Sequence, residues 1–191
     1  MSKTAITAAP IMPVLAERWS PRSYDSSYVI SQHDMLSILE AARWAPSANN
    51  VQPWRFSVAA NGTDLHTKVV EGLSGFNAAW APGASAIIVV SIVATNADGS
   101  EAKSAPFDAG LAVSQLITQA HELDLHTHVI GGVLHDVLHK NLELAENLKV
   151  LVAIAVGKVA PANNLEGPAY EREIAPRTRL ELDEIVLHGK P

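Results

Sequence analysis

Apolar residues recur at helical spacing after Ser31, a helix-capping residue with Asp34 three positions later. The apolar positions within 35–42 follow the i, i+3, i+4, i+7 pattern of a helix with one buried face. Pro46 disfavours the α conformation at Ala45, so this helix is expected to end there. Further helices are predicted at 63–73, 107–123 and 134–145.

Continuous apolar runs predict strands. Residues 84–94 are rich in Ile and Val, which is typical of a central strand buried on both faces, and 149–156 form a second such run. Shorter strands are predicted at 54–60, before the Asn61-Gly62 turn, and at 127–130. Helices and strands alternate, but the last third of the chain does not show regular βαβ units.

The segment 107–123 is apolar almost all round, as in a helix that lies in a domain core or at a subunit interface. The chain after Pro161 is polar, with apolar positions over 180–187 that suit packing on a partner subunit. We therefore expect one domain over residues 1–191, with an N-terminal extension of about 1–15 and a C-terminal tail of about 161–191.

The composition is that of a globular protein: 191 residues, 48% apolar and 18% charged. Lys and Arg number 14 against 20 Asp and Glu, and the net charge of −6 disfavours a general nucleic-acid binder. The lack of cysteine excludes disulfides, Cys-bound zinc, iron–sulfur clusters and a cysteine nucleophile.

No apolar run reaches the length of about 18 residues that spans a bilayer. Lys3 and the apolar residues after it resemble a signal peptide faintly, but Pro10 and Pro13 interrupt that stretch. We therefore expect a cytoplasmic protein that has neither a membrane nor a nucleic acid as a partner.

Common nucleotide, protease and hydrolase motifs are absent: no Gly-x-Gly-x-x-Gly follows a strand, and there is no Walker loop, His-Glu-x-x-His or Gly-x-Ser-x-Gly. His135 and His139 lie four residues apart on a predicted helix, and His126 and His128 alternate on a predicted strand. This spacing is compatible with a metal site. Because no carboxylates complete such a site, surface or core histidines are the favoured interpretation.

Two arginine pairs lie far apart in the sequence. Arg18, Ser20 and Arg22 would point the same way in an extended segment, and paired guanidinium groups suit a phosphate. Arg177 and Arg179 repeat that spacing near the C-terminus. The alternative for both pairs is ordinary solvated surface.

The loop 45–54, Ala-Pro-Ser-Ala-Asn-Asn-Val-Gln-Pro-Trp, holds three side-chain amides, a hydroxyl and two prolines between a helix and a strand. A rigid loop of this kind can offer hydrogen bonds to a planar heterocycle. The alternative is a well-capped turn in which Asn has its usual role.

Taken together, these segments resemble the nitroreductase family of FMN-dependent oxidoreductases. The stretch 18–24 looks like that family's opening Arg-x-Ser-x-Arg/Lys-x-Phe/Tyr motif, and 40–56 looks like its most diagnostic signature. Phe76-Asn77, Asp108-Ala109-Gly110, Ile130-Gly131-Gly132 and Arg177-Thr178-Arg179 follow in the family's order and rough spacing. The similarity covers about 18–185.

The resemblance implies an α+β fold with a central, mostly antiparallel sheet between helical layers, and FMN at a homodimer interface. It implies that the long helix forms this interface and that the tail extends over the other subunit. Two FMN molecules would be bound, with NADH or NADPH as the hydride donor. The cofactor-binding residues implied are Arg18, Trp19, Ser20, Arg22, Pro46, Ser47, Ala48, Asn50, Gln52, Asn77, Ile130, Gly131, Gly132, Arg177 and Arg179.

Roles follow from the same resemblance. Arg18, Ser20, Arg22 and Arg179, with Arg177, would hold the phosphate and ribityl chain. Asn77 would reach the ring edge, the backbone of 131–132 would approach the redox-active nitrogen, and Ser47, Ala48 and Asn50 would come from the partner chain. Arg22 is the candidate for a positive group near the pyrimidine edge, which favours reduction. No catalytic side chain and no metal ligand are implied, because the flavin carries the chemistry.

Two departures from the family pattern bear on function. Many members have a lysine shortly after the asparagine, whereas Ala78, Ala79 and Trp80 follow Asn77 here. The stretch between Ser91 and Phe107 is also short, which implies an open or dimer-lidded site.

The leading hypothesis is a ping-pong FMN oxidoreductase that passes a hydride from NAD(P)H to a nitroaromatic, a quinone or a related small-molecule acceptor. The alternatives are a same-fold enzyme that destroys flavin or dehalogenates its substrate, and a non-catalytic flavin-binding or storage protein.

Overall fold

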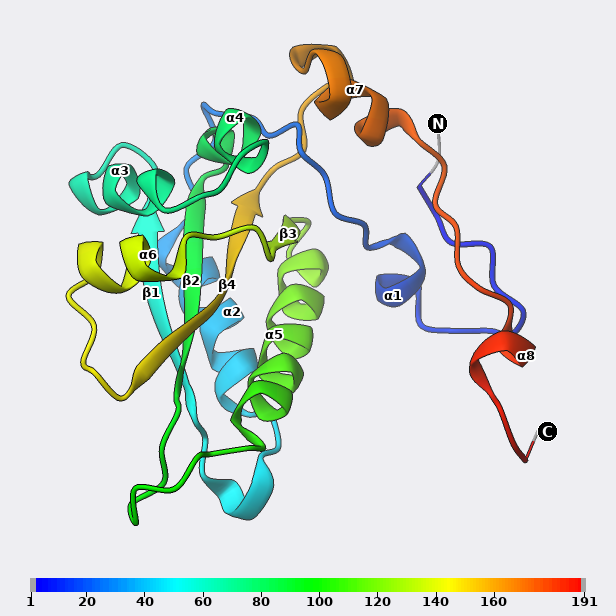
Figure 1. Ribbon diagram of the computed structural model, residues 1–191. Coiled ribbons are helices and arrows are strands. Elements are labelled where there is room, and N and C mark those ends of the chain that lie inside the picture. Colours follow the sequence, from blue (N-terminus) through cyan, green and yellow to red (C-terminus); the bar gives the residue numbers. More distant parts are fainter. Residues whose placement is uncertain (1–2, 190–191) are drawn as a thin grey trace.

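The computed structural model describes residues 3–189 as a four-stranded sheet between two helical layers (Figure 1). The strands are β1 (Trp54–Ala60), β2 (Ala86–Val93), β3 (His126–Ile130) and β4 (Leu148–Gly157), in the spatial order β1-β2-β4-β3. Every neighbouring pair is antiparallel. The predicted α+β fold with an antiparallel sheet and all four predicted strands are confirmed.

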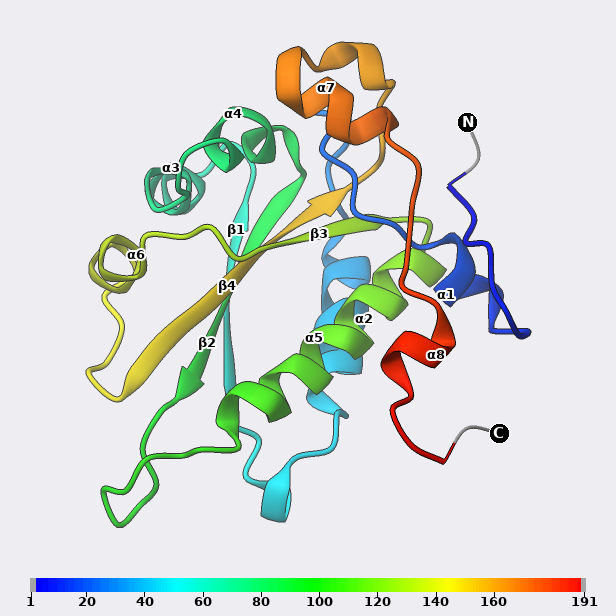
Figure 2. The same cartoon turned by 45° about the vertical axis from the view of Figure 1, so that its right-hand side comes forward.

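Helices cover both faces of the sheet (Figures 1 and 2). On one face lie α2 (Gln32–Arg43) and α5 (Ala105–Glu122), and on the other lie α3 (Asp64–Glu71), α4 (Asn77–Trp80) and α6 (His135–Asn141). Two separate clusters of buried side chains fill the two layers, with Ile88 and Val90 in the first and Ile87 and Val89 in the second. The expectation that β2 is buried on both faces is therefore confirmed.

The predicted helix ends differ from the observed ones by a few residues. The Ser31 side chain accepts a hydrogen bond from the Asp34 N–H at 3.0 Å, so the expected cap of α2 is confirmed. The helix expected over 134–145 ends earlier, at Asn141, and Glu143 then takes a φ of +50°. Leu142 and Leu144 pack against the second buried cluster after the helix has ended, so they continued the apolar pattern beyond the helix itself.

Helix α5 is buried on one side only. Ala105, Ala109, Ala112 and Leu116 face the core, while Phe107 is 71% exposed. Gly110, Ser114 and Gln115 are exposed as well. The predicted helix is confirmed. Within one chain only one of its faces lies in the core, and a subunit interface for the other face stays a prediction.

The two ends of the described chain lie together, away from the sheet (Figures 1 and 2). Helix α1 (Pro13–Glu17) follows an extended N-terminal segment, and α7 (Gly167–Ile174) and α8 (Leu182–Ile185) belong to the tail after β4. The Lys3 ammonium donates to the carbonyls of Glu173 and Ala175 at 2.6 Å each. Residues 1–2 and 190–191 of the expected extension and tail lie outside the described residues.

The sequence pattern did not predict α1, α4, α7 or α8. Helices α1, α4 and α8 have only four or five residues, and α7 lies in a polar segment and buries only Ala169 and Glu173. Over residues 3–189, no helix has both the length and the apolar character needed to cross a membrane.

Candidate functional site

Arginines from distant parts of the chain gather where the two chain ends meet. Burial lowers the pKa of Arg18, and the nearby charges of Arg177 and Arg179 lower it further. Arg18 Nη1 donates to Ser20 Oγ at 3.3 Å. Within residues 3–189, no carboxylate forms an ion pair with these three guanidinium groups. Like charges held together without a counterion are a suitable site for an anion.

The two tail arginines have different surroundings. Arg177 Nη1 donates to the backbone carbonyl of Ala16 at 2.7 Å and to that of Lys3, so part of this guanidinium fastens the N-terminal segment. Arg179 is exposed and donates to the carbonyl of Thr178 at 2.7 Å. Arg179 is therefore freer to bind a ligand than Arg177.

Arg22 lies farther along the same side of the fold, with its guanidinium carbon 6.0 Å from the Phe76 ring centroid and 5.9 Å from that of Trp80. Burial lowers its pKa, partly offset by the charge of Glu173. Its Nε atom is buried and has no hydrogen-bond partner among residues 3–189. A buried N–H without an acceptor is costly, and a bound polar group would satisfy it.

Glu173 fixes the backbone beside Arg22. This α7 residue is 2% exposed, and its carboxylate accepts hydrogen bonds from the N–H of Arg22 at 2.7 Å and of Ser23 at 3.3 Å. Burial raises the pKa of Glu173, although these hydrogen bonds oppose the rise. The sequence analysis missed this residue, because nothing near position 173 in the sequence signals a partner about 150 residues earlier.

Asn77 and the 131–132 loop meet at a close backbone approach. Asn77 Nδ2 donates to the carbonyls of Ser74 and Gly132 at 3.4 Å each, and the Ser74 N–H donates to Gly132 O at 3.0 Å. A Cβ atom on Gly132 would lie 2.6 Å from Asn77 Nδ2 and 2.9 Å from Ser74 Oγ, so a larger residue would displace these side chains. A Cβ on Gly131 would meet nothing within 4 Å, while the preceding Ile130 is buried.

The 45–53 loop lies at the opposite end of the fold from α4 and α7 (Figures 1 and 2). Within one chain, the predicted site residues of this loop therefore do not lie at the arginine cluster. They are Pro46, Ser47, Ala48, Asn50 and Gln52. The loop is nevertheless well ordered by its own contacts: Ser47 Oγ accepts from the Gln52 N–H at 3.0 Å, and the Ala48 N–H donates to Asp108 at 3.3 Å.

The same loop holds unusual backbone conformations. Asn49, Asn50 and Gln52 have φ values of +50°, +56° and +52°. Left-handed backbone outside glycine carries strain, and such strain concentrates at functional sites. Asn adopts these conformations more readily than most residues, which accounts for positions 49 and 50 but not for Gln52.

The histidines do not form a metal site in the described part of the chain, which holds no cluster of three or more metal-ligating side chains. His135 Nδ1 and His139 Nε2 lie 3.0 Å and 3.2 Å from backbone carbonyls. Burial lowers the pKa of His126 and of His128 to about 4 each, so both rings are neutral near pH 7. Trp19 packs edge-on against His126, with 6.1 Å between ring centroids.

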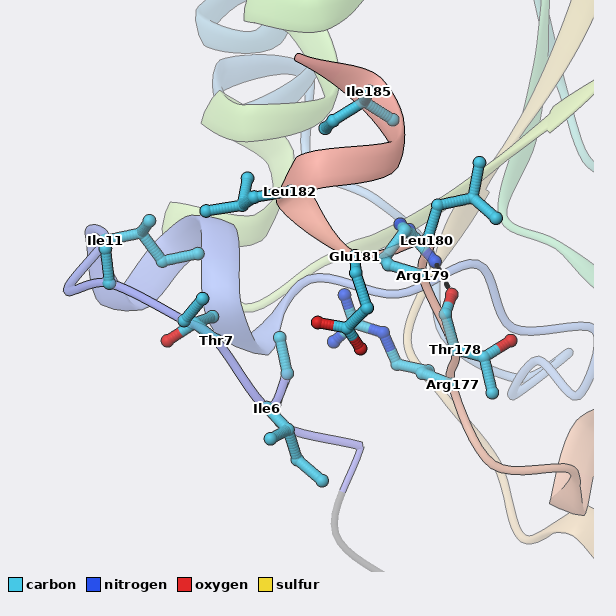
Figure 3. A pocket seen from close by; sticks show the side chains of 13 residues that line it. Ile6, Thr7, Ile11, Arg177, Thr178, Arg179, Leu180, Glu181, Leu182 and Ile185 are labelled. Carbon is cyan, nitrogen blue, oxygen red and sulfur yellow. Dashed lines mark hydrogen bonds between the residues drawn. The ribbon is translucent and has the colours of Figure 1, made fainter. Parts of the chain in front are cut away.

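A cavity of about 640 Å³ lies between the N-terminal segment and the tail (Figure 3). Arg177 and Arg179 line it together with Ile6, Leu180 and Leu182, so it is mostly apolar. Asn77 and Gly132 are not part of its wall. The cavity therefore includes the tail arginines of the predicted site but not the residues predicted to contact the flavin ring.

Known proteins match this chain over most of its length. The model of the family described as "Nitroreductase family" matches residues 15–74 and 63–158. A crystal structure described as an oxidoreductase containing FMN superposes with a TM-score of 0.92 at 34% identity, covering 100% of this chain and 97% of that one. A putative nitroreductase from Exiguobacterium sibiricum, solved in complex with FMN, shares the fold at 24% identity, with a TM-score of 0.76 and coverage of 95% and 98%.

Curated relatives match over shorter segments. The putative NAD(P)H nitroreductase YdgI of Bacillus subtilis is 39% identical over 87 residues, which is 46% of this chain. That match spans 41% of the relative's length.

Proposed function

The chain belongs to the nitroreductase family, and from that premise we propose that it is an FMN-dependent oxidoreductase. In this proposal it passes a hydride from NADH or NADPH to an electron-poor acceptor, such as a nitroaromatic or a quinone, by a ping-pong mechanism in the cytoplasm. The relative that matches over the whole chain is described as containing FMN, and YdgI is named an NAD(P)H nitroreductase. Bound FMN would supply the hydride chemistry.

The residues present fit this cofactor. Arg18, Ser20 and Arg179 would hold its phosphate, with Arg177 bracing the chain beside them. Asn77, positioned by its hydrogen bond to Gly132, would face the ring edge. The observation that carries the proposal is the uncompensated arginine cluster, which has no counterion within residues 3–189.

Arg22 has a defined part in this scheme. Its buried Nε–H has no acceptor among the described residues and would donate to the cofactor. Its charge lies beside Trp80 and would favour the added negative charge of the reduced cofactor. Ala78, Ala79 and Trp80 follow Asn77 here, whereas many family members have a lysine shortly after the asparagine.

We also propose that the protein acts as a homodimer. Large apolar side chains are exposed on the tail and on the outer face of α5, including Leu180 at 65%, Leu187 at 76% and Phe107 at 71%. Packing against a second chain would remove these side chains from water. A second chain would also bring a 45–53 loop to the arginine cluster, which one chain cannot do by itself.

We expect the purified holoprotein to sediment as a dimer, at twice the chain mass of 20.3 kDa. The physical reason is the apolar surface on α5 and the tail, which a single chain leaves in water. Analytical ultracentrifugation at micromolar concentration measures the mass. A monomer that still binds FMN would contradict both the dimer and the proposed contribution of Ser47 and Asn50 from the partner.

Mixing the yellow holoprotein anaerobically with NADH or NADPH tests the function. We expect the flavin absorbance to bleach within milliseconds to seconds and to recover when a quinone or nitroaromatic is added. A protein that binds FMN but does not bleach with either donor would support flavin storage, and the oxidoreductase proposal would then be wrong.

A further inference from the structure

One cation at the proposed site has no role in the scheme above. Arg172 lies on α7, and its guanidinium carbon is 4.9 Å from the centroid of the Phe76 ring. The guanidinium of Arg22 is 6.0 Å from that same centroid. Phe76 immediately precedes Asn77, so two guanidinium groups flank the residue next to the proposed ring contact.

The position of Arg172 is fixed by its neighbour on the helix. Glu173 is buried and holds α7 against the backbone of Arg22 and Ser23. Lys3 donates to two carbonyls at the C-terminal end of the same helix. Because α7 is held at both places, Arg172 is a fixed feature of the surface beside Phe76 rather than part of a free tail.

The charge of Arg172 is not neutralised. The side chain is exposed, and within residues 3–189 it forms no ion pair with a carboxylate. Glu173, the next residue, is turned inward and engaged by backbone N–H groups. The positive charge of Arg172 is among the causes that lower the pKa of Arg22. A chain with a net charge of −6 therefore presents a local positive surface here.

We propose that Arg172 is a specificity-determining residue that binds an anionic group, such as a sulfonate, carboxylate or phosphate, on the molecule that enters the site. The inference rests on the proposed function, because it places the entering molecule beside Asn77. Arg provides paired donors with the geometry of such oxyanions, and its guanidinium carbon already lies 4.9 Å from the centroid of the Phe76 ring. The remaining N–H edges are free to meet a ligand.

The test compares two ligands of nearly equal shape, naphthalene-2-sulfonate and the neutral naphthalene-2-sulfonamide. Each is titrated into the oxidised holoprotein, and binding is followed by the flavin absorbance. Arg172→Gln should weaken binding of the sulfonate by about two- to fivefold, as for one partly exposed ion pair, and leave the sulfonamide unchanged. Arg172→Lys should keep most of the difference, and added salt should reduce it.

Lys140→Gln is the matched control, because it removes one exposed positive charge at the C-terminal end of α6. It should leave the ratio of the two dissociation constants unchanged. A phosphate on the hydride donor is a second source of the same chemistry, so the binding ratio of NADPH to NADH is measured with the same variants.

The outcomes separate this inference from the proposed function. A change in either ratio in Arg172→Gln supports the inference and tells which molecule carries the anion. If the variant binds FMN normally and neither ratio changes, the inference is wrong while the proposed function stands. If the wild-type chain takes up no FMN, the proposed function is wrong, and the inference is wrong with it.

Discussion

Replacing Arg18 or Arg179 by alanine is expected to weaken FMN binding by roughly 10- to 150-fold. Both side chains belong to the cluster in which neighbouring charges lower the pKa of Arg18. Hydrogen bonds that involve charged groups contribute about 1.5–3 kcal/mol each, which gives this range at about 1.4 kcal/mol per decade. Titration of the apoprotein with FMN, followed by quenching of flavin fluorescence, measures the change.

The control for charge is Arg43→Ala. Arg43 is exposed on α2 and paired with Glu40, with 2.7 Å between Nε and Oε2, and it is not part of the cluster. This variant should bind FMN as the wild type does. The Arg18→Ala/Arg179→Ala double variant should show non-additive coupling, and riboflavin, which lacks the phosphate, should bind it and the wild type about equally weakly. If both single variants bind FMN as the wild type does, the assignment of the phosphate site to these arginines fails.

Replacing Glu173 by alanine is expected to destabilise the protein and to weaken FMN binding at the same time. The variant would leave the N–H groups of Arg22 and Ser23 without their acceptor. Each buried donor left unsatisfied costs about 1–3 kcal/mol. Urea denaturation of the apoprotein measures the first effect, and FMN titration measures the second, because the backbone of Arg22 would no longer be held.

Two variants show whether the effect belongs to this carboxylate. Glu173→Gln keeps one oxygen acceptor of similar shape, so it should lose less stability than the alanine variant. Glu171→Ala changes an exposed residue of the same helix and should change neither stability nor FMN affinity appreciably. An unfolding free energy of Glu173→Ala equal to that of Glu171→Ala would contradict the role given to Glu173.

Periodicity was sufficient to predict the body of the fold. The four strands and the helices α2, α3, α5 and α6 each contain a run or a repeat of apolar residues, because each contributes side chains to one or both of the buried clusters. Helix α7 has no such signal: its main anchor is a single buried carboxylate that meets the backbone of residues 22–23. A contact between distant segments that is made by one polar residue leaves no local pattern in the sequence.

The candidate site was predictable to a different extent in its two halves. Spacing alone paired Arg18 with Arg22 and Arg177 with Arg179, and the structure brings Arg18 close to the tail pair. Nothing in the local sequence distinguishes Arg177, which donates to backbone carbonyls, from Arg179. The 45–53 loop was identified by its amides. The proposal that a second chain brings this loop to the arginines came from the family resemblance and not from the chemistry of the loop itself.

The link between Arg177 and the N-terminal segment bears on the order of events during synthesis. Arg18 is synthesised early. Arg177, which donates to the carbonyls of Lys3 and Ala16, and Arg179 are synthesised only after all four strands. All four strands of the antiparallel sheet end by Gly157, so every strand pairing lies within the part of the chain made before the tail. The arginine cluster is therefore completed last, and the sheet of a nascent chain can fold before the proposed phosphate site is complete.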